Sequence, residues 1–257
     1  MPWSIEQKPH QVFTRNPLVA VVVDLRYHPI LKVTDRVADF QDRVRASFPG
    51  FQEATRQLVS VNPFGPIDVR SDKLFQFREE NGAATLTLTS GGLTLECLRH
   101  EHRRVFLDGM KVGSDALEAT YAPISPTRLG LRYINVIDRA QVSKDLGREV
   151  LWDALIAPAF RAVPSGLAEF DGAAFACEVS STMPTGAMTL RYGLLREQPG
   201  GELSFRLDID RYVEGSVVAS AISKTLEGFS NDIFSVFVAA MGPDLQEWMP
   251  AKEDLHE

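Results

Sequence analysis

The chain has 257 residues, of which 44% are hydrophobic and 24% are charged, and its net charge is −7 at pH 7. This length suits one large domain or two small ones packed together, and the composition excludes long disordered stretches. The acidic balance argues against indiscriminate nucleic-acid binding, which needs an excess of lysine and arginine.

Targeting features and cysteine usage indicate the cytoplasm. The start of the sequence lacks the basic and apolar segments of a signal peptide, and no apolar stretch approaches the roughly 20 residues that cross a bilayer. Cys97 and Cys177 lie in apolar, strand-like runs, and two buried thiols fit a reducing compartment. We therefore expect a cytoplasmic protein without a membrane partner.

The first part of the chain predicts a strand, a helix and a loop. Apolar side chains alternate over residues 17–29, as they do in a strand with one buried face. Thr34 is the expected N-cap of a helix whose apolar stripe reaches Phe48, and the Pro-Gly pair that follows ends it. The proline-rich segment 62–66 is expected to be a loop.

An antiparallel meander is expected next, with strands at residues 74–78, 84–89 and 93–98 joined by an Asn-Gly turn and a Ser-Gly-Gly turn. Residues 104–121 allow either another hairpin or a helix. We favour the helix, because its apolar residues fall on one face and Gly113 would permit close packing. A further strand is expected at 124–137.

The second half of the sequence predicts a similar succession of helices and strands. A helix is expected at residues 149–160, and three long strands follow at 173–181, 187–196 and 202–212. A helix with a wide apolar face at 222–241 closes the chain. We predict an α+β fold of two helix-plus-antiparallel-meander halves, residues 1–140 and 141–257, packed into one body and consistent with a duplication.

Arginine-tyrosine pairs are the main candidate for a functional surface. Four of the five tyrosines follow an arginine, three of them in Leu-Arg-Tyr tripeptides ending at Tyr27, Tyr133 and Tyr192. On a strand, Leu and Tyr share one face and Arg points to the other. A row of guanidinium groups on neighbouring strands would bind phosphate or carboxylate. The alternative is a solvent-facing arginine paired with a carboxylate such as Asp24, Asp138 or Asp210.

The candidate ligand-binding residues are the three tripeptide arginines, two of the tyrosines and an asparagine in the middle strand: Arg26, Tyr27, Arg132, Tyr133, Asn135 and Arg191. If Asn135 is buried, its amide needs hydrogen-bond partners. It therefore serves either a ligand or the sheet itself.

Catalytic and cofactor motifs are missing from the sequence. His100-Glu101-His102 has the two-residue spacing of metal ligands on a strand, but basic neighbours favour a solvated connector. His28 near Asp24 offers a general base without a nucleophile. Phosphate-binding glycine loops are absent. We therefore expect no metal and no cofactor.

Three segments carry a resemblance to a known family. They are Pro17-Leu18-Val19-Ala20-Val21-Val22-Val23-Asp24-Leu25-Arg26-Tyr27, Leu129-Gly130-Leu131-Arg132-Tyr133-Ile134-Asn135-Val136-Ile137 and Asn231-Asp232-Ile233-Phe234-Ser235-Val236-Phe237. These resemble the opening strand, central strand and closing helix of a sporadically distributed family of uncharacterised bacterial proteins of about 250 residues. The family commonly has a histidine in that helix, and this chain has none there. The resemblance implies a bacterial, cytoplasmic protein and supplies no activity.

The first functional hypothesis is a non-enzymatic binding or adaptor protein that holds a protein partner or an anionic ligand on the sheet. One alternative is a metal-independent nucleic-acid-processing enzyme of ferredoxin-like architecture, in which His28 does acid-base work. Another is a small-molecule-binding protein with a pocket closed by the last helix. A homodimer through the apolar face of that helix stays open.

Overall fold

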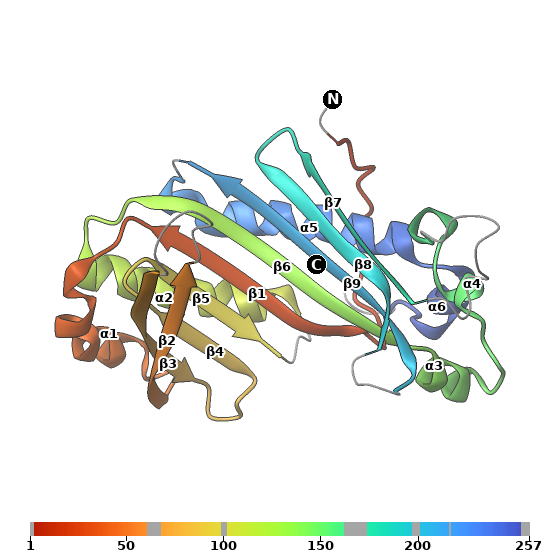
Figure 1. Ribbon diagram of the computed structural model, residues 1–257, viewed down its shortest axis with the longest axis horizontal. Helices are drawn as coiled ribbons and strands as arrows, with labels where there is room; N and C mark the ends of the chain where they lie inside the picture. Colours follow the sequence, from red (N-terminus) through yellow and green to blue (C-terminus); the bar gives the residue numbers. More distant parts are fainter. Residues whose placement is uncertain are drawn as a thin grey trace. The chain divides into compact units, whose positions relative to one another are not determined.

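The computed structural model describes residues 3–60, 68–98, 102–161, 174–196, 201–215 and 217–252. These residues form an α+β protein, as the sequence predicts. Its open antiparallel sheet has nine strands in the hydrogen-bonded order β2-β3-β4-β5-β1-β6-β9-β8-β7 (Figure 1). The chain divides into two compact units, each assembled from separate stretches, whereas the predicted halves are continuous. Unit 1 comprises Met1–Ala20, Leu131–Tyr212 and Glu227–Glu257, and unit 2 comprises Val21–Gly130 and Val213–Leu226.

Unit 2 contains the antiparallel succession of β2 (Gly50–Ser60), β3 (Asp68–Arg78), β4 (Ala84–Leu88), β5 (Gly92–Cys97) and β1 (Leu18–Tyr27). The predicted meander is confirmed as β3-β4-β5. The sequence does not predict β2, because the β2-β3 pairing includes polar contacts such as Lys73–Glu53 in place of strict apolar alternation. The loop expected at 62–66 lies outside the described residues.

The core of unit 2 lies between the sheet and two helices, α1 (Val37–Val44) and α2 (Arg103–Tyr121). The strand register aligns buried side chains in cross-strand rows, of which one is Phe75, Leu88, Leu93 and Leu25. Each such side chain contributes about 1.5–3 kcal/mol on burial. The helix predicted over residues 104–121 is confirmed as α2. A Cβ on Gly113 would lie 2.9 Å from the Leu86 side chain, so the glycine allows the close approach.

The helix after β1 begins later than the sequence predicts. Leu31–Arg36 form a 3-10 helix, and α1 starts at Val37 without a side-chain cap, so the N-cap prediction for Thr34 is wrong. The apolar stripe is buried nonetheless. The Phe40 ring, for example, lies 5.3 Å from the Phe77 ring on β3.

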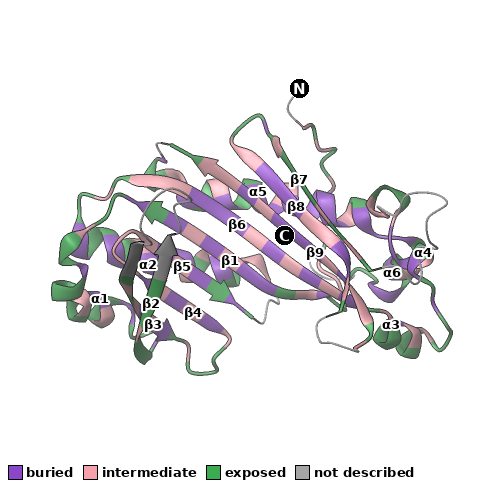
Figure 2. Ribbon diagram, in the orientation of Figure 1, coloured by how far each residue is buried: buried purple, intermediate pink, exposed green. Residues whose placement is uncertain are grey.

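Unit 1 contains β6 (Pro126–Asp138), which begins in unit 2, together with β9 (Leu203–Glu214), β8 (Ala187–Arg196) and β7 (Phe175–Thr182). Helix α5 (Ile222–Ala240) lies across one face of β6, β9 and β8 (Figure 1). Buried and half-buried residues alternate along β6, as expected for a strand with one covered face (Figure 2). None of the described helices is long and apolar enough to span a membrane.

Short helices close one end of unit 1. The sequence predicts one helix over 149–160, but the structure has only the single turn α4 (Trp152–Leu155) and a 3-10 turn at Pro158–Phe160. The prediction fails because proline lacks the N–H that would continue the helix. Two helices not predicted are α3 (Arg139–Leu146) and α6 (Pro243–Trp248). Asp138 caps α3, and Gly147, with φ of 67°, ends it.

Residues 3–16 form an extended strap on unit 1, without a helix or a named strand. The Trp3 N–H donates to Thr182 O on β7, and the Gln7 amide donates to Asp232 on α5. The Phe13 ring stacks on Phe234 at 5.9 Å between centroids. The strap therefore joins α5 to the end of β7.

Candidate functional site

Each unit has one sheet face covered by helices and an opposite face, which we call the open face. In unit 2 the open face carries Asp24 and Thr94, and in unit 1 it carries Arg132 and Asp208. The tripeptides place Tyr27 and Tyr133 among the buried residues, at 3% and 8% exposure, while the side chains of Arg26 and Arg132 remain 61% and 38% exposed. The arginines thus occupy the open faces, as the period-two pattern predicts.

On unit 2, two arginines share a single carboxylate. Arg26 Nε donates to Asp24 Oδ2 at 2.9 Å, and Arg128 Nη1 donates to the same oxygen at 2.7 Å. The Thr94 hydroxyl donates to Asp24 Oδ1 at 3.3 Å. We call Asp24, Arg26, Arg128 and Thr94 the Asp24 cluster. Asp24 therefore shares its negative charge between two guanidinium groups.

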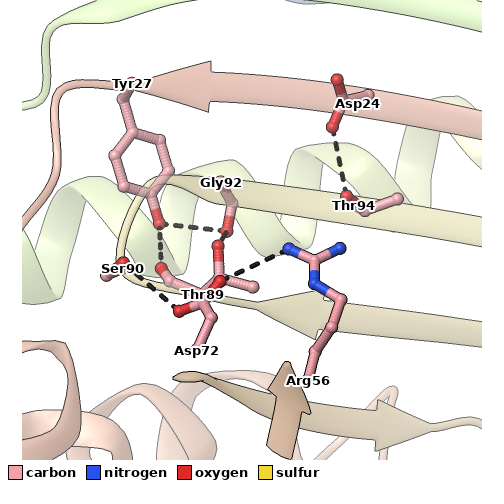
Figure 3. A network of polar contacts seen from close by, with 8 residues as sticks. All are labelled: Asp24, Tyr27, Arg56, Asp72, Thr89, Ser90, Gly92 and Thr94. Atoms are coloured by element: carbon pink, nitrogen blue, oxygen red, sulfur yellow. Dashed lines mark hydrogen bonds and ion pairs between the residues drawn. The ribbon is translucent and has the colours of Figure 1, made fainter. Parts of the chain in front are cut away.

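Tyr27 belongs to a separate network that closes the turn between β4 and β5. Its hydroxyl donates to the carbonyls of Thr89 and Gly92, at 2.9 and 3.2 Å (Figure 3). The Ser90 hydroxyl in the same turn donates to Asp72, which also accepts from Arg56 on β2. Burial raises the pKa of the Tyr27 hydroxyl well above its ordinary value. This tyrosine therefore holds the turn between β4 and β5.

On unit 1, four charged residues form a row across four neighbouring strands. Arg132 on β6 donates two hydrogen bonds to Asp208 on β9, at 2.7 and 2.5 Å. Arg191 on β8 is the register partner of Asp208, and its Nε donates to Glu178 on β7 at 2.6 Å. We call these four residues the charge row. Its signs alternate and its net charge is zero.

The Arg132–Asp208 pair is the more enclosed part of the charge row. The Asp208 side chain is 3% exposed and accepts both bonds of the guanidinium fork. These hydrogen bonds raise the pKa of Arg132. Next to the row, Ser180 on β7 and Thr189 on β8 share a hydrogen bond of 2.8 Å.

Tyr133 and Asn135 have structural partners on the covered face of unit 1. The Tyr133 hydroxyl lies 3.0 Å from the Ser230 hydroxyl of α5, and the Asn135 amide donates to Leu207 O on β9 at 3.2 Å. Asn135 is 3% exposed. The structure therefore gives both side chains a role in joining β6 to its neighbours.

The fourth Arg-Tyr pair is inverted. Arg211 points to the covered face of unit 1 and is 2% exposed. It donates to Asp232 on α5 at 2.9 Å and to the carbonyls of Ala187 and Tyr212. Its guanidinium also lies 4.6 Å from the centre of the Phe229 ring. Arg211 thus anchors α5 to the sheet.

Among the described residues, His28 does not have the carboxylate partner that the enzyme alternative requires. His28 is exposed, and Asp24, its expected carboxylate, is bound instead by the two arginines of the Asp24 cluster. No group of three or more metal-ligating side chains occurs among the described residues. His100 and Glu101 of the histidine cluster lie outside them.

Two cavities bear on the small-molecule alternative. One, of about 220 Å³ in unit 2, lies between the last turns of α2 and the residues leading into α5, with Leu117, Glu118 and Ser220 in its wall. The other, of about 280 Å³ in unit 1, lies beneath Phe13 of the strap. Both are smaller than the roughly 300–1,000 Å³ of ordinary ligand pockets.

The sequence interpretation misses the residues that decide the character of each open face. Arg128, Asp208 and Glu178 are not among the predicted site residues. Arg128 had a readable signal, because it lies four residues before Arg132 and shares its face of β6. The two acidic partners depend on strand order. Compared with models of known protein families and with curated proteins, the chain shows no match.

Proposed function

We propose that this chain is a non-enzymatic binding protein that holds an anionic group of a protein partner at Arg26 on the open face of unit 2. The single observation that carries the proposal is the exposure of the Arg26 guanidinium, whose side chain is 61% exposed and whose bond to Asp24 uses only Nε. Asp24 also accepts a hydrogen bond from Arg128, so its charge is shared between the two guanidinium groups.

Arg26 is the member of the cluster that can bind a ligand. Only its Nε is bonded to Asp24, and no described residue accepts from its two terminal nitrogens. Two parallel N–H donors on a planar guanidinium match the two oxygens of a carboxylate or a phosphate. Arg128, with a side chain only 13% exposed, instead holds Asp24 in place.

The surroundings of Arg26 leave room for an incoming group. Its register partner on β5 is Gly92, which has no side chain. The other carboxylate of this face on β5, Glu96, pairs with Val22, four residues from Arg26 along β1. Four residues of strand span about 13 Å, so Glu96 is too far to neutralise Arg26 directly.

A binding titration tests the proposal. Fluorescein-labelled peptides of four glutamates, of four glutamines, and of glutamines around one phosphoserine are titrated with the full chain, and fluorescence anisotropy is measured. We expect saturable binding of the anionic peptides only, weakening at least threefold between 50 and 300 mM salt because exposed charges are screened. A preference between glutamate and phosphoserine separates the two sources of negative charge.

The matched variants are Arg26→Gln and Arg45→Gln. Arg45 is 67% exposed and pairs with one carboxylate at 3.2 Å, but it lies beyond the C-terminus of α1 and away from the sheet. Arg26→Gln should weaken anionic peptide binding at least fivefold, and Arg45→Gln should leave it unchanged. Equal weakening by both variants, or no binding by the unmodified chain, overturns the proposal.

Family, origin and location are proposals of the same kind. We propose membership of the bacterial family described above, with a cytoplasmic location. The three segments that carry the resemblance lie in β1, β6 and α5. Descent of the two meanders from one ancestral half is likewise proposed, since each unit joins antiparallel strands to a covering helix.

A further inference from the structure

We propose that two copies of this chain associate through the open face of unit 1, with the charge row at the centre of the contact. The surface differs from the one proposed to bind a partner, and the two proposals stand independently. The charge row provides the argument, because its alternating signs make it complementary to a second copy in one specific orientation.

The charges follow one another across the sheet in a fixed order. From β6 to β7 they are Arg132, Asp208, Arg191 and Glu178, that is, plus, minus, plus, minus. Arg191 and Glu178 are 41% and 60% exposed, so both can take part in a second ion pair. Neighbouring charges lie on adjacent strands, about 4.8 Å apart.

A two-fold axis parallel to the strands, between β9 and β8, makes the row self-complementary. Such an axis reverses the order of the strands and turns the second face toward the first. Arg132 then lies opposite the partner's Glu178, and Asp208 lies opposite the partner's Arg191. Every position of the row then faces the opposite sign. Arg132 and Glu178 make the direct contacts, while Asp208, which is 3% exposed, acts through its charge from beneath Arg132. An axis parallel to the row would pair like charges, so only the first orientation is attractive.

The residues beside the row agree with this orientation. Asp210 is the register partner of Thr189, and Arg206 is the register partner of Gly193, so the axis sets each charge opposite an uncharged residue of the other copy. Half-buried Ile134 on β6 and Leu195 on β8 also lie on this face and add apolar area.

The size of the face indicates a reversible dimer. Four strands about 4.8 Å apart and about ten residues long give an area of roughly 630 Å² per copy. Stable interfaces bury about 800 Å² per partner, so the contact falls at the low end of that class. We expect a dissociation constant of roughly 10–100 µM that rises with salt.

Sedimentation equilibrium of the full chain between 5 and 300 µM tests the inference. The decisive variant is the double exchange Arg191→Glu/Glu178→Arg, which keeps the intramolecular ion pair and the net charge. The row then reads plus, minus, minus, plus, so a two-fold copy meets like charges throughout. We expect the association constant to fall at least tenfold with unchanged circular dichroism. The melting temperature should fall by a few degrees, because the new glutamate at position 191 lies opposite Asp208.

The control is the exchange Lys111→Asp/Asp115→Lys on α2, whose side chains are 63% and 64% exposed and which lies off this face. It should leave association unchanged. An unmodified chain that stays monomeric at 300 µM and 50 mM salt, or a row exchange that associates normally, overturns the inference.

A cross-link gives a second test that does not depend on the row exchange folding. In the Arg132→Lys variant, a zero-length carbodiimide should join position 132 to the partner's Glu178. Within one chain these positions are three strands apart, about 14 Å, which is too far for such a link. Recovery of the joined peptides from the dimer fraction alone supports the inference, and their absence contradicts it.

Discussion

The open faces of the two units carry the same kinds of side chain but differ in how the charges are matched. In unit 1 each arginine of the charge row has its own carboxylate, Arg132 with Asp208 and Arg191 with Glu178. In unit 2, Arg26 and Arg128 share Asp24. A matched row is complementary to its own reversed copy, whereas the shared carboxylate of unit 2 leaves the two terminal nitrogens of Arg26 for another molecule. The number of arginines on a face therefore says less about its function than whether each arginine has a carboxylate of its own.

If an arginine with its own carboxylate has a structural role, the loss in the free energy of unfolding on breaking the pair should be larger the more deeply the pair is buried. The largest effect is expected for Arg211→Ala, which leaves Asp232 without its buried partner. We expect the free energy of unfolding to fall by about 3–5 kcal/mol. Urea denaturation measures the change. Arg206→Ala on the open face of the same strand is the control and should cost no more than about 0.5 kcal/mol.

The next effect is expected in the charge row itself. Asp208→Asn removes the carboxylate beneath Arg132, and we expect a loss of about 2 kcal/mol. This is less than for a fully buried pair, because the Arg132 side chain is 38% exposed to solvent. The double variant Asp208→Asn/Arg132→Gln should lose less than the sum of the two single changes. Strict additivity in this double-mutant cycle would mean that the pair is not coupled.

Stability at alkaline pH should depend on two buried groups of unit 2. Burial raises the pKa of the Cys97 thiol and of the Tyr121 hydroxyl to about 12 each, and both groups lie in unit 2. Their folded-state pKa values exceed the unfolded ones, so the folded state keeps protons that the unfolded state loses. Stability is fully present below about pH 9 and falls as pH rises toward 12, by up to about 1.4 kcal/mol per pH unit for each group.

Denaturant unfolding at pH 8, 9 and 10 checks this prediction. Cys97→Ala should flatten the decline between pH 9 and 10, because the thiol is the first of these groups to titrate in the unfolded chain. Val21→Ala, at the register partner of Cys97, is the control, because it removes buried apolar volume but no titratable group and should leave the slope as it is. A slope that is the same in both variants contradicts the assignment to Cys97.

The smallest effect is expected for Arg26→Gln. An exposed ion pair contributes about 0–1 kcal/mol, so the free energy of unfolding should change by less than about 0.5 kcal/mol. Differential scanning calorimetry of this variant and of Arg191→Gln should give melting temperatures within a few degrees of the unmodified chain. A large destabilisation by Arg26→Gln alone would make that residue structural, and it would remove the contrast between the two faces.

Local patterns predicted much of the fold. Period-two alternation located β1, β6, β8 and β9, and the wide apolar stripe located α5. Elements without such a pattern were missed. β2 depends on cross-strand polar pairs with β3, and α3 buries only Val142. The local pattern also predicted that a helix begins after Thr34. In the structure Thr34 lies within a 3-10 helix that precedes α1.

For the candidate site too, local patterns predicted some features and missed others. The direction of each tripeptide arginine follows from strand geometry, so the sequence placed Arg26, Arg132 and Arg191 on the open faces. Their partners follow from strand order and register. Asp208 is 76 residues from Arg132, and Glu178 is 13 residues from Arg191. Asp24 is the exception, because it lies two residues before Arg26 on the same strand and is confirmed as a carboxylate that this arginine binds. Of the other two carboxylates named from the sequence, Asp210 acts on Arg132 through its charge and Asp138 caps α3. No local pattern reports which distant strand becomes a neighbour.

The strap affects the order in which parts of the chain can fold during synthesis. Residues 3–16 are synthesised long before the residues on which they dock, Thr182, Asp232 and Phe234, and before Lys252, which donates a backbone hydrogen bond to Val12. Residues 21–130 of unit 2 can pair as soon as they emerge, whereas unit 1 waits for nearly the whole chain. During synthesis the strap segment therefore keeps its aromatic side chains exposed to chaperones until residues 182–252 have emerged.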